Sequence, residues 1–118
     1  MKILICGDRN WTDENAILDF LNYFQKTYPI ELVIEGGANG ADKLAGRVAS
    51  SLGIPILEIR PDWEVYGKGA GHIRNQQMLD EKPNLVLAFH DNIGESKGTA
   101  DCLTRAEDRD IIYILISH

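Results

Sequence analysis

The segment Glu35–Asp42, EGGANGAD, joins a run of strand-forming residues to an alanine-rich amphipathic segment at residues 41–52. Its glycines, Gly36, Gly37 and Gly40, permit positive φ angles and let a ligand approach the main chain closely. The first amides of the following helix lack intrahelical acceptors, and the helix dipole adds partial positive charge there. A strand, a glycine turn and a helix N-terminus in this order predict a site for phosphate or carboxylate. A tight turn without a ligand explains the same glycines equally well.

The composition is that of an ordinary globular protein. Hydrophobic residues at 44% and charged residues at 25% argue against disorder, and 118 residues suit one domain, 1–118. No apolar run is long enough to span a bilayer, and the MKILICG start is too short for a secretory signal. The net charge of −6 argues against general binding of DNA or RNA, while a small anionic ligand is compatible with it. We expect a cytoplasmic protein with no membrane partner.

The two cysteines, Cys6 and Cys102, have neither metal-ligand spacing nor the context of a disulfide framework. Cys6 falls in a predicted buried strand and Cys102 in a predicted helix. We interpret both as reduced thiols, and the sequence predicts neither a metal site nor a cofactor.

Strand and helix patterns alternate along the chain. Continuous apolar runs predict strands at residues 2–6, 31–35, 54–59, 85–89 and 111–116. Amphipathic patterns predict helices at residues 13–28, 41–52, 72–80 and 99–109. Such alternation is typical of a parallel sheet that is covered by helices on both faces. The predicted fold is a single Rossmann-like α/β domain of three layers, with a five-stranded, mainly parallel sheet in the order 3-2-1-4-5.

A second glycine turn, Gly94–Asp101 (GESKGTAD), leads directly into the last predicted helix. Gly98 permits a close approach, and Thr99 offers a hydroxyl at the helix start, where a plain N-cap is the alternative. In sheets of this type ligands bind beyond the carboxyl ends of the strands, where the strand order reverses. Two glycine turns at that edge favour a shared anion site more than either turn does alone.

The segment DWEVYGKGAGHIRNQQM, residues 62–78, is predicted to supply a cation to this edge. Arg74 is expected in the first turn of a helix, where the dipole disfavours positive charge. That placement favours a ligand over the alternative of a surface ion pair with Asp62 or Glu64. Asn75 is suited either to donate to a phosphate or hydroxyl group or to cap the backbone.

Aromatic and basic side chains are also expected at this edge. Trp11, Trp63 and Tyr66 fall on predicted loops, and flat aromatic faces suit a nucleobase. For Trp63 the alternative is a small local core beneath its loop. Lysines and arginines on the loops add positive charge, and they are Arg9, Lys68 and Lys97.

With these motifs assembled, the chain resembles the SLOG superfamily, specifically its YspA/YpsA-related branch of small bacterial and phage proteins. The resemblance rests on GDRNWTD, GGANGAD, DWEVYGKGAGHIRNQQM and SKGTAD, which follow one another over nearly the whole length. It implies a Rossmann-like fold that binds nucleotides or nucleotide-derived small molecules through the two glycine turns.

The enzymatic relatives implied by the resemblance are the LONELY GUY phosphoribohydrolases, which cleave the N-glycosidic bond of adenosine monophosphate derivatives. Their M-H-x-R-K motif is matched at His72 and Arg74, and their P-G-G-x-G-T-x-x-E motif is matched at Gly98 and Thr99. The final glutamate of the second motif is replaced by Cys102.

The carboxylate that glycosidic cleavage needs must therefore come from elsewhere. Asp101 lies one residue before Cys102, about 100° around a helix. Gly94–Lys97 replace the proline and the paired glycines of the same motif. Other candidate acids are Asp8 and Asp42, although Asp42 and Asp101 are equally explained as dipole-favoured residues at helix starts.

The leading hypothesis is binding of a nucleotide or nucleotide-derived small molecule, for sensing, sequestering or processing. The alternative is an N-glycoside hydrolase of nucleoside monophosphate derivatives, with Asp101 or Asp42 as acid/base and Arg74 holding the phosphate. A protein-interaction module without a ligand is a further alternative, and a homo-oligomer is compatible with the sequence. The predicted ligand-binding residues are Gly7, Arg9, Gly36, Gly37, Ala38, Asn39, Gly40, Asp42, Trp63, Tyr66, Arg74, Asn75, Lys97, Gly98 and Thr99.

Overall fold

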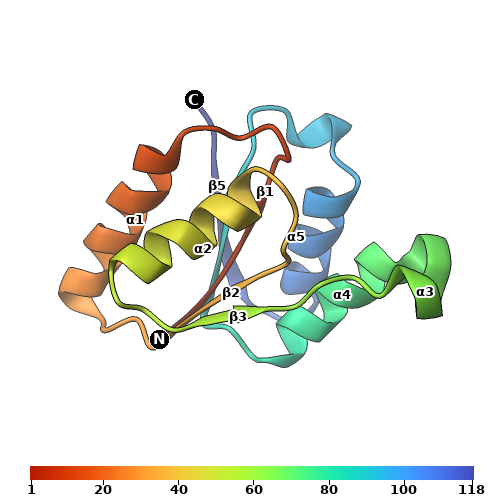
Figure 1. Ribbon diagram of the computed structural model, residues 1–118, viewed down its shortest axis with the longest axis horizontal. Helices are drawn as coiled ribbons and strands as arrows, with labels where there is room; N and C mark the ends of the chain where they lie inside the picture. Colours follow the sequence, from red (N-terminus) through yellow and green to blue (C-terminus); the bar gives the residue numbers. More distant parts are fainter.

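The computed structural model describes residues 1–118 as three layers with a sheet in the middle (Figure 1). The strands are β1 (Lys2–Gly7), β2 (Leu32–Glu35), β3 (Ile56–Glu58), β4 (Leu85–Phe89) and β5 (Ile112–Ile116). The helices are α1 (Glu14–Thr27), α2 (Ala41–Ser51), α3 (Trp63–Tyr66), α4 (Ala70–Asp80) and α5 (Gly98–Asp108). Short 3₁₀ turns lie at Gly67–Gly69 and Ile93–Glu95.

The sheet confirms the predicted topology. All four strand pairs are parallel, and the order is β3-β2-β1-β4-β5. In the central strand, Ile3 lies beside Val33 on one side and Leu85 on the other. Helices α1 and α2 cover one face and α4 and α5 cover the other, as Figure 1 shows. None of these helices combines the length and the apolar character needed to cross a bilayer.

The two faces of β1 explain why its sequence is apolar without alternation. Ile3 and Ile5 pack into the core beneath α1 and α2, while Leu4 and Cys6 pack into the core beneath α4 and α5. Each fully buried aliphatic side chain contributes about 1.5–3 kcal/mol to folding. The apolar runs of β1 and β4 therefore mark strands that have a helix layer on each side, whereas the edge strands β3 and β5 expose part of their apolar side chains.

The glycine-rich segment before α4 differs from the prediction of one long loop. Trp63–Tyr66 form the short helix α3, and the Asp62 carboxylate caps it by accepting a hydrogen bond from the amide of Val65 at 3.1 Å. Helix α4 then begins at Ala70, two residues before the predicted start, and the Ala70 side chain is completely buried.

Trp11 lies on the loop after β1, as the sequence predicted, but its ring is not exposed there to stack on a nucleobase. Its ring is buried, with its centroid 5.5 Å from that of Phe89 and stacked on His118 at 4.4 Å. The indole nitrogen donates a hydrogen bond to the carbonyl of Asp13 at 2.9 Å. Trp11 thus anchors the loop after β1 to the core, which fixes the residues that precede it.

Candidate functional site

A cavity of about 350 Å³, called here the central cavity, opens at the carboxyl ends of β1 and β4. The strand order reverses between these two strands, which is the usual ligand position in such sheets. Its walls are the loop after β1, the beginning of α2, the second turn of α4 and the loop that leads into α5. The lining residues are Cys6, Gly7, Asp8, Arg9, Asn10, Ala38, Asp42, Arg74, Asn75, Met78, His90, Glu95, Ser96, Lys97, Gly98 and Thr99.

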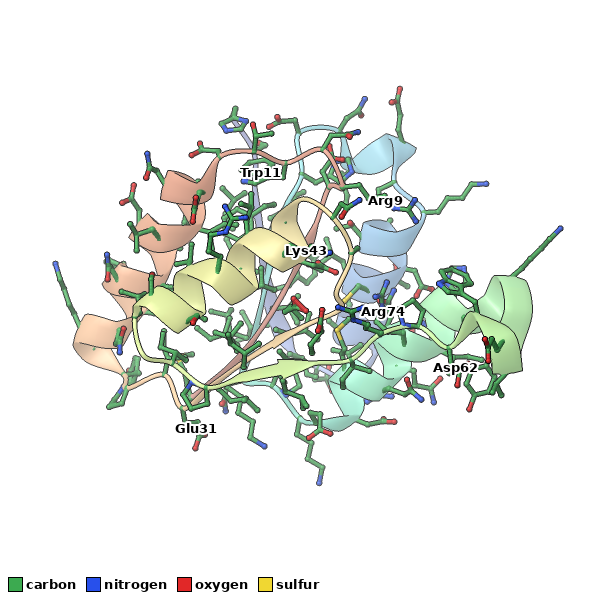
Figure 2. All side chains as sticks on the ribbon, in the orientation of Figure 1. Arg9, Trp11, Glu31, Lys43, Asp62 and Arg74 are labelled. Atoms are coloured by element: carbon green, nitrogen blue, oxygen red, sulfur yellow. The ribbon has the colours of Figure 1, made fainter.

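A second cavity of about 540 Å³ lies beside it and is called here the arginine cavity. Its lining residues are Arg9, Gly36, Gly37, Ala38, Asn39, Arg60, Pro61, Trp63 and Arg74. The two cavities share Arg9, Ala38 and Arg74, and Figure 2 shows Arg9 and Arg74 in the same region of the molecule, near α5. Two predicted ligand-binding residues, Gly40 and Tyr66, line neither cavity.

Arg74 lies between the two glycine turns. Its Nη1 donates a hydrogen bond to the carbonyl of Gly36, and its Nε donates to Oδ1 of Asn75 at 3.2 Å. It forms no ion pair with Asp62 or Glu64. The prediction of a first-turn position is wrong, because α4 begins at Ala70 and Arg74 therefore falls in the second turn. Its hydrogen bonds, rather than the helix dipole, orient this guanidinium group.

Asn75 connects α4 to the start of α5. Its Nδ2 donates one hydrogen bond to the carbonyl of Gly98 and another to Oδ2 of Asp101, both at 3.0 Å. Only 3% of Asn75 is exposed, and its oxygen accepts from Arg74. Asn75 thereby ties the position of the second glycine turn to the position of Arg74.

Asp101 lies outside the lining of both cavities. It accepts hydrogen bonds from Asn75 and from Nε of Arg105 at 2.9 Å, and its Oδ1 lies 3.1 Å from Nδ1 of His72. Burial alone raises the pKa of Asp101, but the hydrogen bonds from Asn75, Arg105 and His72 outweigh this effect, and the pKa is lowered. These contacts keep Asp101 ionised and hold α4 against α5.

The second glycine turn is capped by Ser96, whose hydroxyl oxygen accepts a hydrogen bond from the amide of Thr99 at 3.0 Å. Thr99 is buried and is the second residue of α5, so the alternative that Thr99 is a plain N-cap is wrong. The amide of Thr99 is thus already hydrogen bonded, and the amide of Asp101 donates to the carbonyl of Lys97 at 3.0 Å, while Gly98 and Thr99 both line the central cavity. This helix start offers partial positive charge to an anion.

The first glycine turn also has amides that are bonded within the chain, and their acceptors are carboxylates. Gly37 and Gly40 have φ angles of +75° and +77°, as the sequence suggested. However, the amide of Gly37 donates to Oε1 of Glu35 at 2.8 Å, and the amide of Ala38 donates to Oδ2 of Asp42 at 3.2 Å. Two of the amides expected to bind a ligand are therefore already hydrogen bonded to carboxylates of the chain itself.

These two carboxylates are unusually well buried. Only 3% of Glu35 and 6% of Asp42 is exposed. Burial, followed by the charges of Asp42 and Glu58, raises the pKa of Glu35 to about 7. Burial also raises the pKa of Asp42 to about 6, although hydrogen bonds from the amides and the charge of Arg74 oppose the change. Asp42 can therefore take up or release a proton near neutral pH inside the central cavity.

The ionisation of Glu35 and Asp42 predicts how stability depends on pH. Both pKa values are higher in the folded chain than in the unfolded chain, so the folded state binds more protons between about pH 4 and pH 7. We expect the free energy of unfolding, measured by urea denaturation, to fall as the pH rises through this range. At about pH 8 the Glu35→Gln variant should be more stable than wild type by about 1 kcal/mol or more, with a flatter pH profile. The exposed Glu107→Gln serves as the control, and an equal response of the two variants would contradict the prediction.

Sequence reasoning missed three residues of this region, Glu35, Glu58 and Arg60. Glu35 ends β2 and Glu58 ends β3, and their backbones are paired in the sheet. Arg60 pairs with Glu58, with its Nε 3.3 Å from Oε1. The sequence did contain a signal for Glu35 and Glu58, since each is an acidic residue at the end of an apolar run. The carboxyl ends of neighbouring parallel strands lie at the same edge of a sheet, so two such residues are expected to lie close together.

The two thiols meet beneath the central cavity. A hydrogen bond with Cys102 and burial raise the pKa of Cys6 well above its ordinary value. Cys6 lines the cavity, whereas Cys102 is completely buried, and both are free cysteines. The structure contains no cluster of three or more His, Cys, Asp or Glu side chains that is suited to hold a metal ion.

Comparisons with known proteins agree with this description of the fold. Residues 1–66 match the sequence model of the YspA, cpYpsA-related SLOG family. Gene 61 protein of Mycobacterium phage D29 is 35% identical over 119 residues, an alignment that covers 96% of this chain and 94% of that protein. The X-ray structure of DNA processing protein A (DprA) from Streptococcus pneumoniae superposes with a TM-score of 0.75 at 13% identity. That superposition covers 97% of this chain but 49% of the DprA chain, so this chain spans about half the length of DprA.

Proposed function

The chain belongs to the YspA, cpYpsA-related SLOG family, and on this basis we propose that it binds a nucleotide or nucleotide-derived small molecule in the central cavity. The observation that carries the proposal is the convergence of the α5 start and Arg74 on one cavity at the point where the strand order reverses. The volume of about 350 Å³ is within the usual range for small-molecule sites.

The phosphate of the ligand would bind at the beginning of α5. The positive end of the α5 dipole and the side chains of Lys97 and Arg74 supply positive charge and donors around one position. Ser96 also lines the central cavity, and it holds the turn by accepting a hydrogen bond from the amide of Thr99, which is therefore not free for the ligand. The first glycine turn contributes less than the sequence suggested, since Glu35 and Asp42 occupy two of its amides.

Isothermal titration of the purified chain against a panel of nucleoside 5′-monophosphates and the matching nucleosides tests this proposal. We expect at least one nucleotide to bind, and to bind more tightly than its nucleoside, because the main contacts are with the phosphate. If no nucleotide binds, or if nucleoside and nucleotide bind equally well, the proposal is wrong. Binding to a protein partner with no nucleotide binding would favour the interaction module.

Asp42 supports a second candidate function, hydrolysis of the N-glycosidic bond of a nucleoside monophosphate. Its pKa of about 6 and its place in the central cavity suit a general acid or base. In this reaction the bond between C1′ of the ribose and the base nitrogen breaks. A water oxygen bonds to C1′, and one proton from the water ends on the departing base.

For the hydrolase we expect Asp42→Asn to reduce the release of free base from AMP by at least about 100-fold, which is typical of losing a general acid or base. Asp101→Asn should reduce it much less, because Asp101 contacts Asn75, Arg105 and His72 outside the cavity lining. Chromatography of the incubated nucleotide measures both rates, and Asp19→Asn, an exchange on α1, is the control. Intact AMP after long incubation with wild type would rule out the hydrolase and leave ligand binding as the function.

A further inference from the structure

Of the two cavities at this edge, the arginine cavity has the more positively charged lining. Arg9, Arg60 and Arg74 line it, and no acidic residue does. The central cavity, by contrast, is lined by three acidic residues, Asp8, Asp42 and Glu95. In a chain with a net charge of −6, three guanidinium groups around one space are a local reversal of charge that favours an anion.

These guanidinium groups are available to a ligand. Neither Arg9 nor Arg74 forms an ion pair with a carboxylate of the chain. Arg60 pairs with Glu58, but both side chains are exposed, and surface ion pairs of this kind contribute little. Arg9 and Arg74 also line the central cavity, so an anion at the boundary between the two cavities is within reach of both side chains.

Trp63 adds an aromatic surface to the outer wall. More than half of this side chain, 54%, is exposed, although tryptophan is usually well buried. The edge of its ring faces Gly71 at the start of α4, where a Cβ atom would lie 3.9 Å from the indole. In Figure 2 the labelled Asp62, its neighbour in sequence, lies beside α4 on the same side of the molecule as Arg74. An exposed indole next to cationic groups suits stacking of a nucleobase.

We propose that the arginine cavity binds a second nucleotide unit of the ligand, and that the ligand class is therefore a dinucleotide with two nucleosides joined through phosphate. The linking phosphates lie at the boundary, between Arg9 and Arg74. Arg60 contacts the phosphate of the second unit, and Trp63 stacks on its base. This inference rests on the proposed function, because the first unit occupies the central cavity. Each cavity alone has a volume within the usual range for small-molecule sites.

The test compares the four 5′-mononucleotides with the four symmetric dinucleotides in which the same nucleosides are joined by a 5′,5′-pyrophosphate. Isothermal titration is performed on wild type, Arg60→Ala, Trp63→Ala and the control Arg47→Ala, which removes an exposed arginine of α2 that pairs with Glu14. We expect the preferred dinucleotide to bind at least about 10-fold more tightly than its mononucleotide. Arg60→Ala and Trp63→Ala should each remove about 10-fold of dinucleotide affinity and leave mononucleotide affinity within about 2-fold.

The outcomes separate this inference from the proposed function. Mononucleotide binding without a dinucleotide preference, unchanged by Arg60→Ala, overturns the second subsite and leaves the proposed function in place. A chain that binds neither ligand class overturns both. Tighter binding of a single-stranded oligonucleotide that depends on Arg60 overturns the dinucleotide class, because the cavity would then belong to a polynucleotide groove.

Discussion

Replacing Gly40 with alanine is expected to lower the free energy of unfolding by about 4 kcal/mol or more, among the largest effects of a single exchange. Gly40 has a φ of +77°, which costs an alanine about 1–2 kcal/mol. In addition, a Cβ atom there would overlap the carbonyl oxygens of Asp8 and Arg9. These are backbone atoms, so the loop after β1 and the first glycine turn would have to move apart.

Gly53→Ala is the matched control for this experiment. Gly53 has a nearly equal φ of +72°, but no atom lies within 4 Å of the position of its Cβ. Urea denaturation should therefore show a loss of only about 1–2 kcal/mol for this variant. Equal losses for the two variants would mean that the backbone conformation alone, and not the close approach to the loop, requires glycine at position 40.

Replacing Arg74 with alanine is expected to weaken nucleotide binding by about 10- to 100-fold. A hydrogen bond to a charged group contributes about 1.5–3 kcal/mol, and each 1.4 kcal/mol is a factor of ten in affinity. Arg74 borders both cavities, and its own hydrogen bonds to Gly36 and Asn75 hold it in place before a ligand arrives. We therefore expect it to contribute more than the exposed Lys97.

Isothermal titration of Arg74→Ala, Arg74→Lys and Arg47→Ala against the preferred nucleotide measures the effect. Lysine keeps the charge but lacks the planar fork of donors, so Arg74→Lys should fall between alanine and wild type. Arg47→Ala should bind as wild type does. Circular dichroism must show folded protein for each variant, because Arg74 also bonds the first glycine turn through Gly36. Unchanged affinity in a folded Arg74→Ala protein would contradict the proposed site.

The central strands were predictable because the apolar pattern of the sequence agrees with their burial in the structure. Ile3, Leu4 and Ile5 are buried in succession, and such a run occurs in a strand with helices on both faces. The start of α4 was not predictable in the same way. Gly69 and Gly71 are typical of a loop, whereas in the structure the 3₁₀ turn Gly67–Gly69 runs directly into α4 and Ala70 is completely buried.

The candidate site was less accessible to sequence reasoning than the fold. The pattern around Gly37 predicted free amides, whereas the side chains of Glu35 and Asp42 fold back and accept two hydrogen bonds from the turn. A glycine motif specifies the course of the backbone, and nearby acidic side chains decide whether its donors remain free. Arg60 was missed because it follows β3 and belongs to none of the motifs. Only the order of the strands in the sheet brings the end of β3, and with it Arg60, to the arginine cavity.

Cys6 and Cys102 lie between the sheet and α5, so the reactivity of their thiols reports how often α5 separates from the sheet. A thiol that is completely buried, like that of Cys102, reacts with an alkylating reagent only while α5 is detached from the sheet. The raised pKa of Cys6 slows its reaction further, because the thiolate is the nucleophile. The rate of alkylation in native buffer therefore measures how often α5 separates from the sheet, and no engineered probe is needed.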